Sequence, residues 1–287
     1  MKPEAVVRAE RALGGRATSW TRVESRGWAR NEHWTFVLDD GARAFAKSAW
    51  LEPSVTWMRR EREIYDRLSG PFMPRLLGWE DGERPLLVLE DLTEGGAYFP
   101  PLWRPGDVEA VLATLAELAE TRIHGLPSFP DSWPQWTSVA DDPAPFLSLG
   151  IASSAWLDRA LPELLAAESA LTFSGPAVLH GDVRSDNLCI RGDRAVLVDW
   201  NHACLGKPGF DVAAWLPSLT LEGGPQPDEV ADAAVSQFAV AIAGYFAAHA
   251  GLLPDEGAPL VRGFQLAQLR VALPWACRVL GIAPPDR

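Results

Sequence analysis

The stretch VLHGDVRSDNLCIRGDRAVLVDW, residues 178–200, constrains this chain of 287 residues more than any other segment. It places Asp182, Asp186, Asn187 and Asp199 beside two runs of Val, Leu and Ile. Burying a carboxylate is costly unless something cationic compensates it. The sequence therefore indicates a metal ion or a reacting group at this stretch.

The same stretch has the pattern of a loop followed by a hairpin. The segments LCI and AVLVDW flank the turn RGDR, which predicts two paired strands. Pairing them brings Asn187 and Asp199 to the same end of the hairpin. Each residue taken singly is an ordinary turn former or helix cap, but their order and spacing favour a chemical role for the set.

Phosphoryl transfer from a nucleotide needs such a set. Its transition state is highly charged, so catalysis is mostly positioning and electrostatic stabilisation. A carboxylate must take or orient the proton of the acceptor hydroxyl, and oxygen ligands must hold Mg²⁺ against the phosphates. Asp182, Asn187 and Asp199 fit the order base, metal amide and metal carboxylate.

The rest of the chain divides by pattern. Residues 1–92 begin with a short charged helix and continue with apolar strand segments such as HWTFVL and RAFAKSAW, which surround a helix at residues 54–70. Residues 93–107 are rich in Gly and Pro and are typical of a connector. Residues 108–287 are mostly helical.

The pattern HGDVRSDN…VDW…GKPGFDVA is similar to that of the aminoglycoside phosphotransferase and choline-kinase-like family, which are small-molecule kinases. The resemblance covers most of residues 20–217. It implies an α+β, two-lobed protein-kinase-like fold, with a small N-terminal antiparallel-sheet lobe holding one helix and a larger, mainly helical C-terminal lobe. Residues 1–92 would bind nucleotide, 93–107 would connect, and 108–287 would carry catalysis and acceptor binding.

By this resemblance, Asp182 matches the catalytic base, and Asn187 and Asp199 match the ligands of Mg²⁺. Asp211 matches a carboxylate that braces the catalytic loop. His180 would orient that loop by hydrogen bonds, with a plain core histidine as the alternative.

Lys47 matches the lysine that grips the nucleotide phosphates, and it is the only lysine between Lys2 and Lys207. Its partner should come from the following helix. Glu61 fits the family pattern best, and Glu63 is the alternative.

Two further nucleotide contacts are implied by the resemblance. The backbone near Glu90, Asp91 and Leu92 would bind the nucleobase. The phosphate-covering loop would lie around Gly27 and Asn31, but it lacks Gly-x-Gly-x-x-Gly, so both ATP and GTP stay open as donors.

Arg184 stands two residues after the expected base. It would either neutralise charge on the transferring phosphoryl group, as a catalytic cation, or form a surface pair with Asp186.

The acceptor site would be built from residues 130–168 and 221–280. Four tryptophans there are candidates for stacking on a sugar or enclosing an amine, although core packing is the alternative for each: Trp133, Trp136, Trp156 and Trp275. Eight acidic residues would suit an aminocyclitol, or simply form solvated helix faces: Asp141, Asp142, Asp158, Glu163, Glu222, Asp228, Glu229 and Asp232.

Composition limits the possible binding partners and the cellular location. The formal net charge of −12 argues against nucleic-acid binding, and the three cysteines lack metal-ligand or disulfide spacing, which favours a reducing cytoplasm. The apolar segment 234–253 is interrupted by polar residues, so we expect a buried helix rather than a membrane span. A monomer and a homodimer are both open.

We therefore predict a Mg²⁺-dependent kinase that transfers the γ-phosphoryl group of ATP or GTP to a hydroxyl of a small molecule. An aminoglycoside-like cationic antibiotic is the first expectation, followed by choline, another hydroxylated amine or a sugar. The alternative class is a nucleotide-binding pseudokinase. A protein kinase is disfavoured because no activation segment of the usual length separates Asp199 from Asp211.

Overall fold

The structure, a computed structural model, describes residues 1–24, 31–254 and 259–286. Its strands are β1 (Ala17–Val23), β2 (Asn31–Leu38), β3 (Arg43–Ala49), β4 (Leu76–Glu80), β5 (Leu86–Glu90), β6 (Ala177–Leu179), β7 (Leu188–Arg191), β8 (Arg194–Leu197) and β9 (Cys204–Gly206). Its helices are α1 (Glu4–Leu13), α2 (Ser54–Tyr65), α3 (Asp107–Glu120), α4 (Gln135–Asp141), α5 (Ala144–Ser148), α6 (Ser154–Ser169), α7 (Phe210–Leu221), α8 (Pro227–Val230), α9 (Ala233–Ser236), α10 (Ala239–Ala250) and α11 (Val261–Leu280). Single 3₁₀ turns lie at η1 (Glu94–Gly96), η2 (Ser185–Asn187) and η3 (Trp200–His202).

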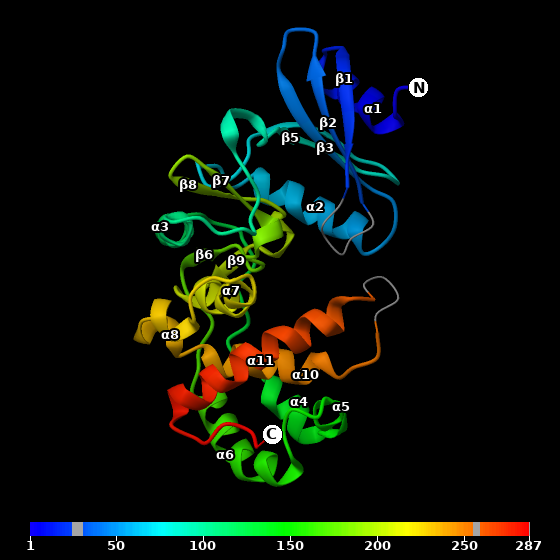
Figure 1. Cartoon of the computed structure of the whole chain (residues 1–287). Helices are drawn as coiled ribbons and strands as arrows, with labels where there is room; N and C mark the ends of the chain where they lie inside the picture. The colour runs from blue at the N-terminus through cyan, green and yellow to red at the C-terminus, as the bar shows by residue number, and fades with distance from the viewer. Residues whose placement is uncertain (25–30, 255–258, 287) are drawn as a thin grey trace.

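The N-terminal lobe is a five-stranded antiparallel sheet in the order β1-β2-β3-β5-β4 (Figure 1). The predicted two-lobed kinase-like fold is confirmed. The lobe contains two helices rather than one, because α1 also packs on the sheet. Strand β1 completes the sheet at its edge; only its first residue is buried, so its sequence lacks the alternation that marks a half-buried strand.

Strand β3 separates the two faces of this sheet. Ala44 and Ala46 are buried on the face that α1 covers, where they join a small apolar core. Phe45 and Lys47 point to the opposite face and line a cavity. Because side chains alternate along a strand, a register shift of one residue would turn Lys47 into the core beneath α1.

The connector and the hairpin β7–β8 tie the two lobes together. Tyr98 in the connector exchanges both backbone hydrogen bonds with Ile190 of β7, at 3.1 and 2.8 Å. Strand β5 ends at Glu90, and α3 begins at Asp107. The connector was predicted at residues 93–107.

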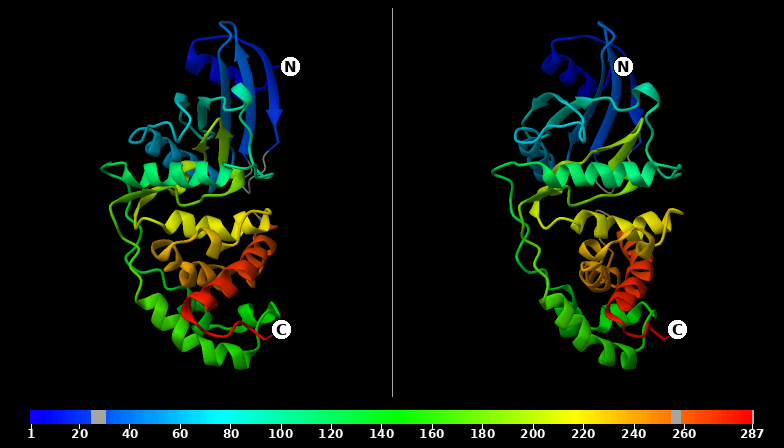
Figure 2. Two further views of the ribbon diagram at one scale, coloured as in Figure 1. Left: turned by 60° about the vertical axis from the view of Figure 1, so that its left-hand side comes forward. Right: turned by 90° about the vertical axis from the view of Figure 1, so that its left-hand side faces the viewer.

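The C-terminal lobe is mainly helical, as Figure 2 shows below α3. Helices α10 and α11 pack against each other, and α4 packs against α10. The segment Ala233–Ala250 is long and apolar enough to cross a membrane, but 56 % of it is buried inside the protein. It therefore serves as a core element of this lobe, as the sequence predicted.

Candidate active site

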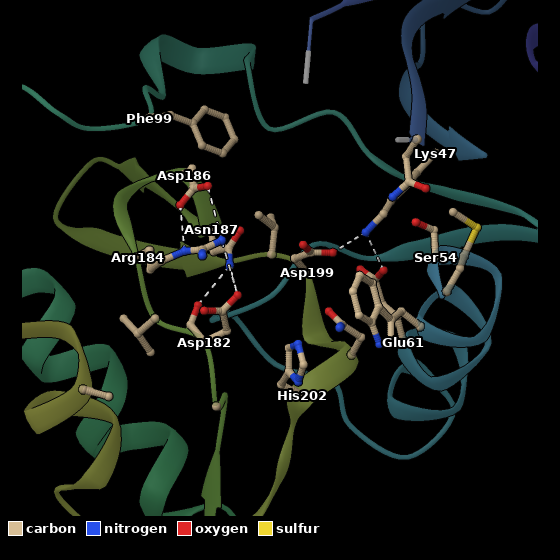
Figure 3. Close-up of a pocket in the computed structure, with 18 of the residues that line it drawn as sticks. Lys47, Ser54, Glu61, Phe99, Asp182, Arg184, Asp186, Asn187, Asp199 and His202 are labelled. Carbon is tan, nitrogen blue, oxygen red and sulfur yellow. Dashed lines mark hydrogen bonds and ion pairs between the residues drawn. The ribbon is translucent and has the colours of Figure 1, made fainter. Parts of the chain in front are cut away.

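A cavity of about 790 Å³ lies between the lobes. Its walls come from β2, β3, α2, the connector, the loop before β7, and helices α10 and α11. The volume is in the range of small-molecule sites. Figure 3 shows the residues from both lobes that meet there.

Asp211 at the start of α7 holds the loop that carries Asp182. Its carboxylate accepts backbone hydrogen bonds from His180, at 2.6 Å, and Gly181, at 2.9 Å. Burial raises the Asp211 pKa to about 6, although these two N–H bonds oppose the rise. Gly181 has a φ of +81°, and a Cβ there would lie 2.6 Å from the His202 carbonyl oxygen, so the bend requires glycine.

His180 is fully buried and does not line the cavity. Its Nε2 lies 2.9 Å from the Val198 carbonyl, which can only accept a hydrogen bond. Its Nδ1 accepts from the Asp182 backbone N–H at 3.3 Å. Burial lowers the His180 pKa, so the neutral ring orients the loop and the hairpin.

The hairpin brings Asn187 and Asp199 to one end, as its pattern predicted. The N–H of Val198 donates to the Asn187 carbonyl at 2.9 Å. The Asn187 side-chain amide donates to the carboxylate of Asp182 at 2.9 Å and to its backbone carbonyl at 3.0 Å. Asp199 has a φ of +68°, in the left-handed region that aspartate tolerates better than most residues.

Lys47 joins the two lobes at the cavity. Its ammonium donates to Glu61 of α2 at 2.8 Å and also contacts Asp199 (Figure 3). Burial alone would lower the Lys47 pKa, but the charges of Asp199 and Glu61 raise it above its ordinary value. Burial alone would raise the pKa of Asp199, but the charge and the hydrogen bond of Lys47, together with the charge of Arg184, lower it below its ordinary value. Glu63 is exposed and lies 3.8 Å from Arg67, so Glu61 is the partner of Lys47.

Arg184 contacts both Asp186 and Asp182, and its role as a catalytic cation stays a prediction. Its guanidinium binds both oxygens of Asp186, at 3.1 and 3.3 Å. It also lies 3.4 Å from the Asp182 carboxylate and lines the cavity. Burial tends to lower the Arg184 pKa, but the charges of Asp182 and Asp186 raise it, so a fixed cation stands beside the candidate base.

The segment Glu90–Leu92 lines the cavity next to Lys47, where the base contact was predicted. The Glu90 side chain binds Arg191 at 3.0 Å, and Asp91 binds Arg43 at 3.0 Å. Ion pairs therefore hold both side chains at the cavity edge.

The phosphate-covering loop is only partly described. Asn31 lines the cavity, and its side-chain oxygen is buried without a hydrogen-bond partner among the described residues. Gly27, the other residue predicted there, lies outside the described residues.

The donor set at the hairpin suits Mg²⁺. No cluster of three or more His, Cys, Asp or Glu side chains forms a metal site among the described residues. However, Asn187 and Asp199 offer an amide and a carboxylate oxygen, and Mg²⁺ commonly takes one or two protein oxygens together with water and phosphates. Asn187 uses its NH₂ group on Asp182, which leaves its oxygen for a cation.

The other end of the cavity differs from the prediction. Of the four candidate tryptophans, only Trp133 lines it; Trp136, Trp156 and Trp275 are buried in the core. None of the eight acidic residues named for the acceptor lines it. Asp182 and its neighbours instead face residues that the sequence analysis did not single out, namely Tyr245, His249, Arg262, Gln265 and Gln268. Their spacing of three or four residues along two apolar helices is a signal that could have identified them.

The family is shown by the sequence. A profile described as the phosphotransferase enzyme family matches residues 25–250. The chain belongs to this family and is a small-molecule kinase. No curated protein sequence matches it.

Solved structures share the fold across almost the whole chain. A spectinomycin phosphotransferase, solved with ADP and spectinomycin, has a TM-score of 0.64 at 10 % identity and covers 96 % of this chain and 97 % of its own. A choline/ethanolamine kinase family protein from Mesorhizobium loti has a TM-score of 0.60 at 15 % identity, covering 96 % and 98 %. A macrolide 2′-phosphotransferase from Brachybacterium faecium has a TM-score of 0.54 at 13 % identity, covering 98 % of each chain. At these identities the likeness extends to the fold alone.

Proposed function

We propose that this chain transfers the γ-phosphoryl group of ATP, or of GTP, to a hydroxyl of a small molecule. Its family is one of ATP-dependent small-molecule phosphotransferases. The observation that carries the proposal is the contact of Lys47 with both Glu61 and Asp199, beside an Asp182 held by Asn187. This arrangement joins a phosphate-gripping cation, a metal-binding pair and a base in one cavity.

Asp182 acts as the base in this proposal. It takes the proton of the acceptor hydroxyl while that oxygen forms a bond to the γ-phosphorus and the bond to the β-γ bridging oxygen breaks. The nucleoside diphosphate then leaves. Asn187 donates to one Asp182 oxygen, at 2.9 Å, and thereby aims the carboxylate.

Lys47 and Arg184 provide the positive charge that the transferring group needs. Lys47 exchanges part of its contact with Asp199 for the nucleotide phosphates, and Glu61 keeps it in place. Arg184, anchored by Asp186, faces the side on which the acceptor enters. Fixed cations of this kind stabilise developing charge without reorganising.

Asn187 and Asp199 would hold Mg²⁺, which neutralises phosphate charge when bound. The lowered pKa of Asp199 keeps this carboxylate ionised at neutral pH, so it is ready to bind a cation.

The pseudokinase alternative is disfavoured because no member of the set is missing or turned away from the cavity. The acceptor expected first, an aminoglycoside-like cation, stays a prediction. The position of the eight acidic residues outside the cavity counts against it.

The test separates nucleotide binding from turnover. Asp182→Asn keeps size and hydrogen bonding but cannot take a proton, so calorimetry should show near-normal Mg-ATP binding. Turnover, measured as ADP formed with a productive acceptor, should fall by roughly 10²- to 10⁴-fold. Asp199→Ala should instead lose most Mg²⁺-dependent nucleotide affinity.

Asp193→Asn is the matched control, because Asp193 is an exposed carboxylate at the turn of the same hairpin. It should change neither measurement. Near-normal turnover of Asp182→Asn would show that Asp182 is not the base.

A further inference from the structure

The acceptor end of the cavity is aromatic. Five rings line it: Phe129, Trp133, Phe210, Tyr245 and Phe246. Trp133 stacks on Tyr245 with ring centroids 5.2 Å apart and planes 21° apart. Trp133 also meets Phe129 and Phe210 edge to face, both at 5.7 Å. Such a wall favours a flat or ring-shaped apolar group, because stacked and edge-to-face contacts add to the energy of burial.

One cation that faces this wall has no carboxylate partner among residues 1–24, 31–254 and 259–286. Arg262, in the first turn of α11, lines the cavity, and no carboxylate of the described residues lies within ion-pair distance of it. Its Nε donates to the Leu253 carbonyl at 3.2 Å, and one terminal nitrogen donates to Gln265 at 2.9 Å. These two bonds hold the Arg262 guanidinium in place. The N–H groups of its second terminal nitrogen make no hydrogen bond with the described residues, so they can bind a ligand.

Gln268, two turns along the same helix, supports this reading independently. It lines the cavity and is only 7 % exposed. Its side-chain amide makes no hydrogen bond within the part of the chain that the structure describes. The amide is not among the fully buried polar atoms that lack a partner, so it is accessible from the cavity and can bind a polar group of a ligand.

Gln265 links Arg262 to the aromatic wall. Burial raises the pKa of Tyr245, and the charge of Asp182 raises it further. Gln265 accepts a hydrogen bond from Arg262 at 2.9 Å and lines the same cavity as Tyr245. Arg262, Tyr245 and Asp182 thus line one cavity.

We infer that the acceptor is a hydroxylated ring compound carrying a carboxylate, with the ring against Trp133 and Tyr245 and the carboxylate on Arg262 and Gln268. This inference rests on the proposed function, since it assigns the acceptor of the same reaction. The guanidinium fork matches a carboxylate in shape as well as in charge. A quaternary amine would suit the rings but would share the cavity with the Arg262 cation, and a polycation would meet the same repulsion.

The test uses three compounds of one shape: 4-(hydroxymethyl)benzoate, 4-(hydroxymethyl)benzamide and 4-(hydroxymethyl)benzylamine. They share ring and hydroxyl and differ only in charge. Binding to the full chain with Mg-ATP analogue present is measured by saturation-transfer NMR. We expect the order benzoate, benzamide, benzylamine, with about 10- to 100-fold between the first and last, the range of a hydrogen bond to a charged group.

Arg262→Gln should remove most of the preference for benzoate, and Gln268→Leu should weaken benzoate and benzamide alike. Arg270→Gln is the matched control, because Arg270 is exposed on the same helix and lies outside the cavity. It should keep the wild-type order. Equal binding of the three compounds by the wild type, a preference for benzylamine, or no binding of any of them would overturn the inference.

Failure of this inference is distinguishable from failure of the proposed function. The wild type is also assayed for ADP formation with Mg-ATP and kanamycin, choline or the benzoate. If kanamycin or choline supports turnover and the benzoate does not, the carboxylate acceptor is wrong and the kinase function stands. Absence of Mg-ATP binding would instead sink the proposed function.

Discussion

The two ends of the cavity are built on different principles. At the nucleotide end, Lys47, Glu61 and Asp199 hold one another by charge, and Asp182 is fixed by Asn187. At the acceptor end, rings such as Trp133 pack on one another and only a few polar groups are present. The difference shows that the reacting charges are positioned by the protein alone, whereas the far end leaves polar groups for the ligand to satisfy.

The nucleotide end should be the more sensitive to a single substitution. Lys47→Ala leaves the buried Glu61 and the half-exposed Asp199 without a compensating charge and removes the phosphate-gripping cation. We expect kcat/KM for Mg-ATP to fall by roughly 10²- to 10³-fold, as for the loss of one fixed donor to a developing charge. Steady-state kinetics measures this, and a change of less than tenfold would contradict the role of Lys47.

The buried brace of the catalytic loop should depend on pH. Burial raises the Asp211 pKa from its ordinary 3.8 to about 6, so the native state binds the proton more tightly than the unfolded state between these values. The stability that this group contributes is fully present below pH 3.8 and is lost as pH rises through 6. The loss in the free energy of unfolding is up to about 3 kcal/mol.

Asp211→Asn cannot titrate, so it isolates that contribution. The free energy of unfolding of Asp211→Asn, relative to wild type, should improve on going from pH 4 to pH 7. Urea unfolding at both values measures the change. If the difference in the free energy of unfolding between Asp211→Asn and the wild type does not change with pH, the pKa of Asp211 is not raised.

Glu61 should have a smaller effect than Lys47, because it positions the lysine and does not touch the nucleotide. Glu61→Ala should lower kcat/KM for Mg-ATP by about tenfold, the equivalent of one hydrogen bond to a charged group. Glu63→Ala, on the exposed side of α2, is the matched control and should be silent. If Glu63→Ala is the damaging change, the assigned pairing is wrong.

Salt should have the smallest effect, and it acts on the acceptor end. A single carboxylate on Arg262 is screened only modestly, so KM for a benzoate-type acceptor should rise less than about threefold between 0.05 and 0.5 M NaCl. A polycation would lose affinity steeply over this range. A steep rise in KM would therefore favour the aminoglycoside-like acceptor.

Part of the nucleotide end could be predicted because it is local: Asn187 and Asp199 flank one hairpin, which brings them to the same end. Lys47 and Glu61 were assigned by the family resemblance, because the contact of Lys47 with Asp199 joins residues 152 positions apart and no local pattern predicts it. The lobe order followed from strand and helix periodicity. Strand β1 was not predicted, because only one of its residues is buried and its sequence shows no alternation.

The acceptor end could not be predicted in the same way. Whether a tryptophan packs in the core or lines a cavity depends on how α4, α6, α10 and α11 meet, and this is long-range packing. Trp136 and Trp275 became core residues for that reason, while Trp133 did not. The acidic residues were solvated faces or, like Glu222, partners of Ser185 and Trp103.

The isolation of Lys47 has a practical consequence for labelling chemistry. The chain contains three lysines, and Lys2 and Lys207 are the other two. Acylating reagents attack the neutral amine, so the raised pKa and burial of Lys47 should leave it unmodified while Lys2 and Lys207 react. Mass spectrometry of the digested, acylated chain then reports on the whole cavity: an acyl group on the peptide that contains Lys47 marks molecules in which the lobes have separated or Lys47 has lost its carboxylate partners.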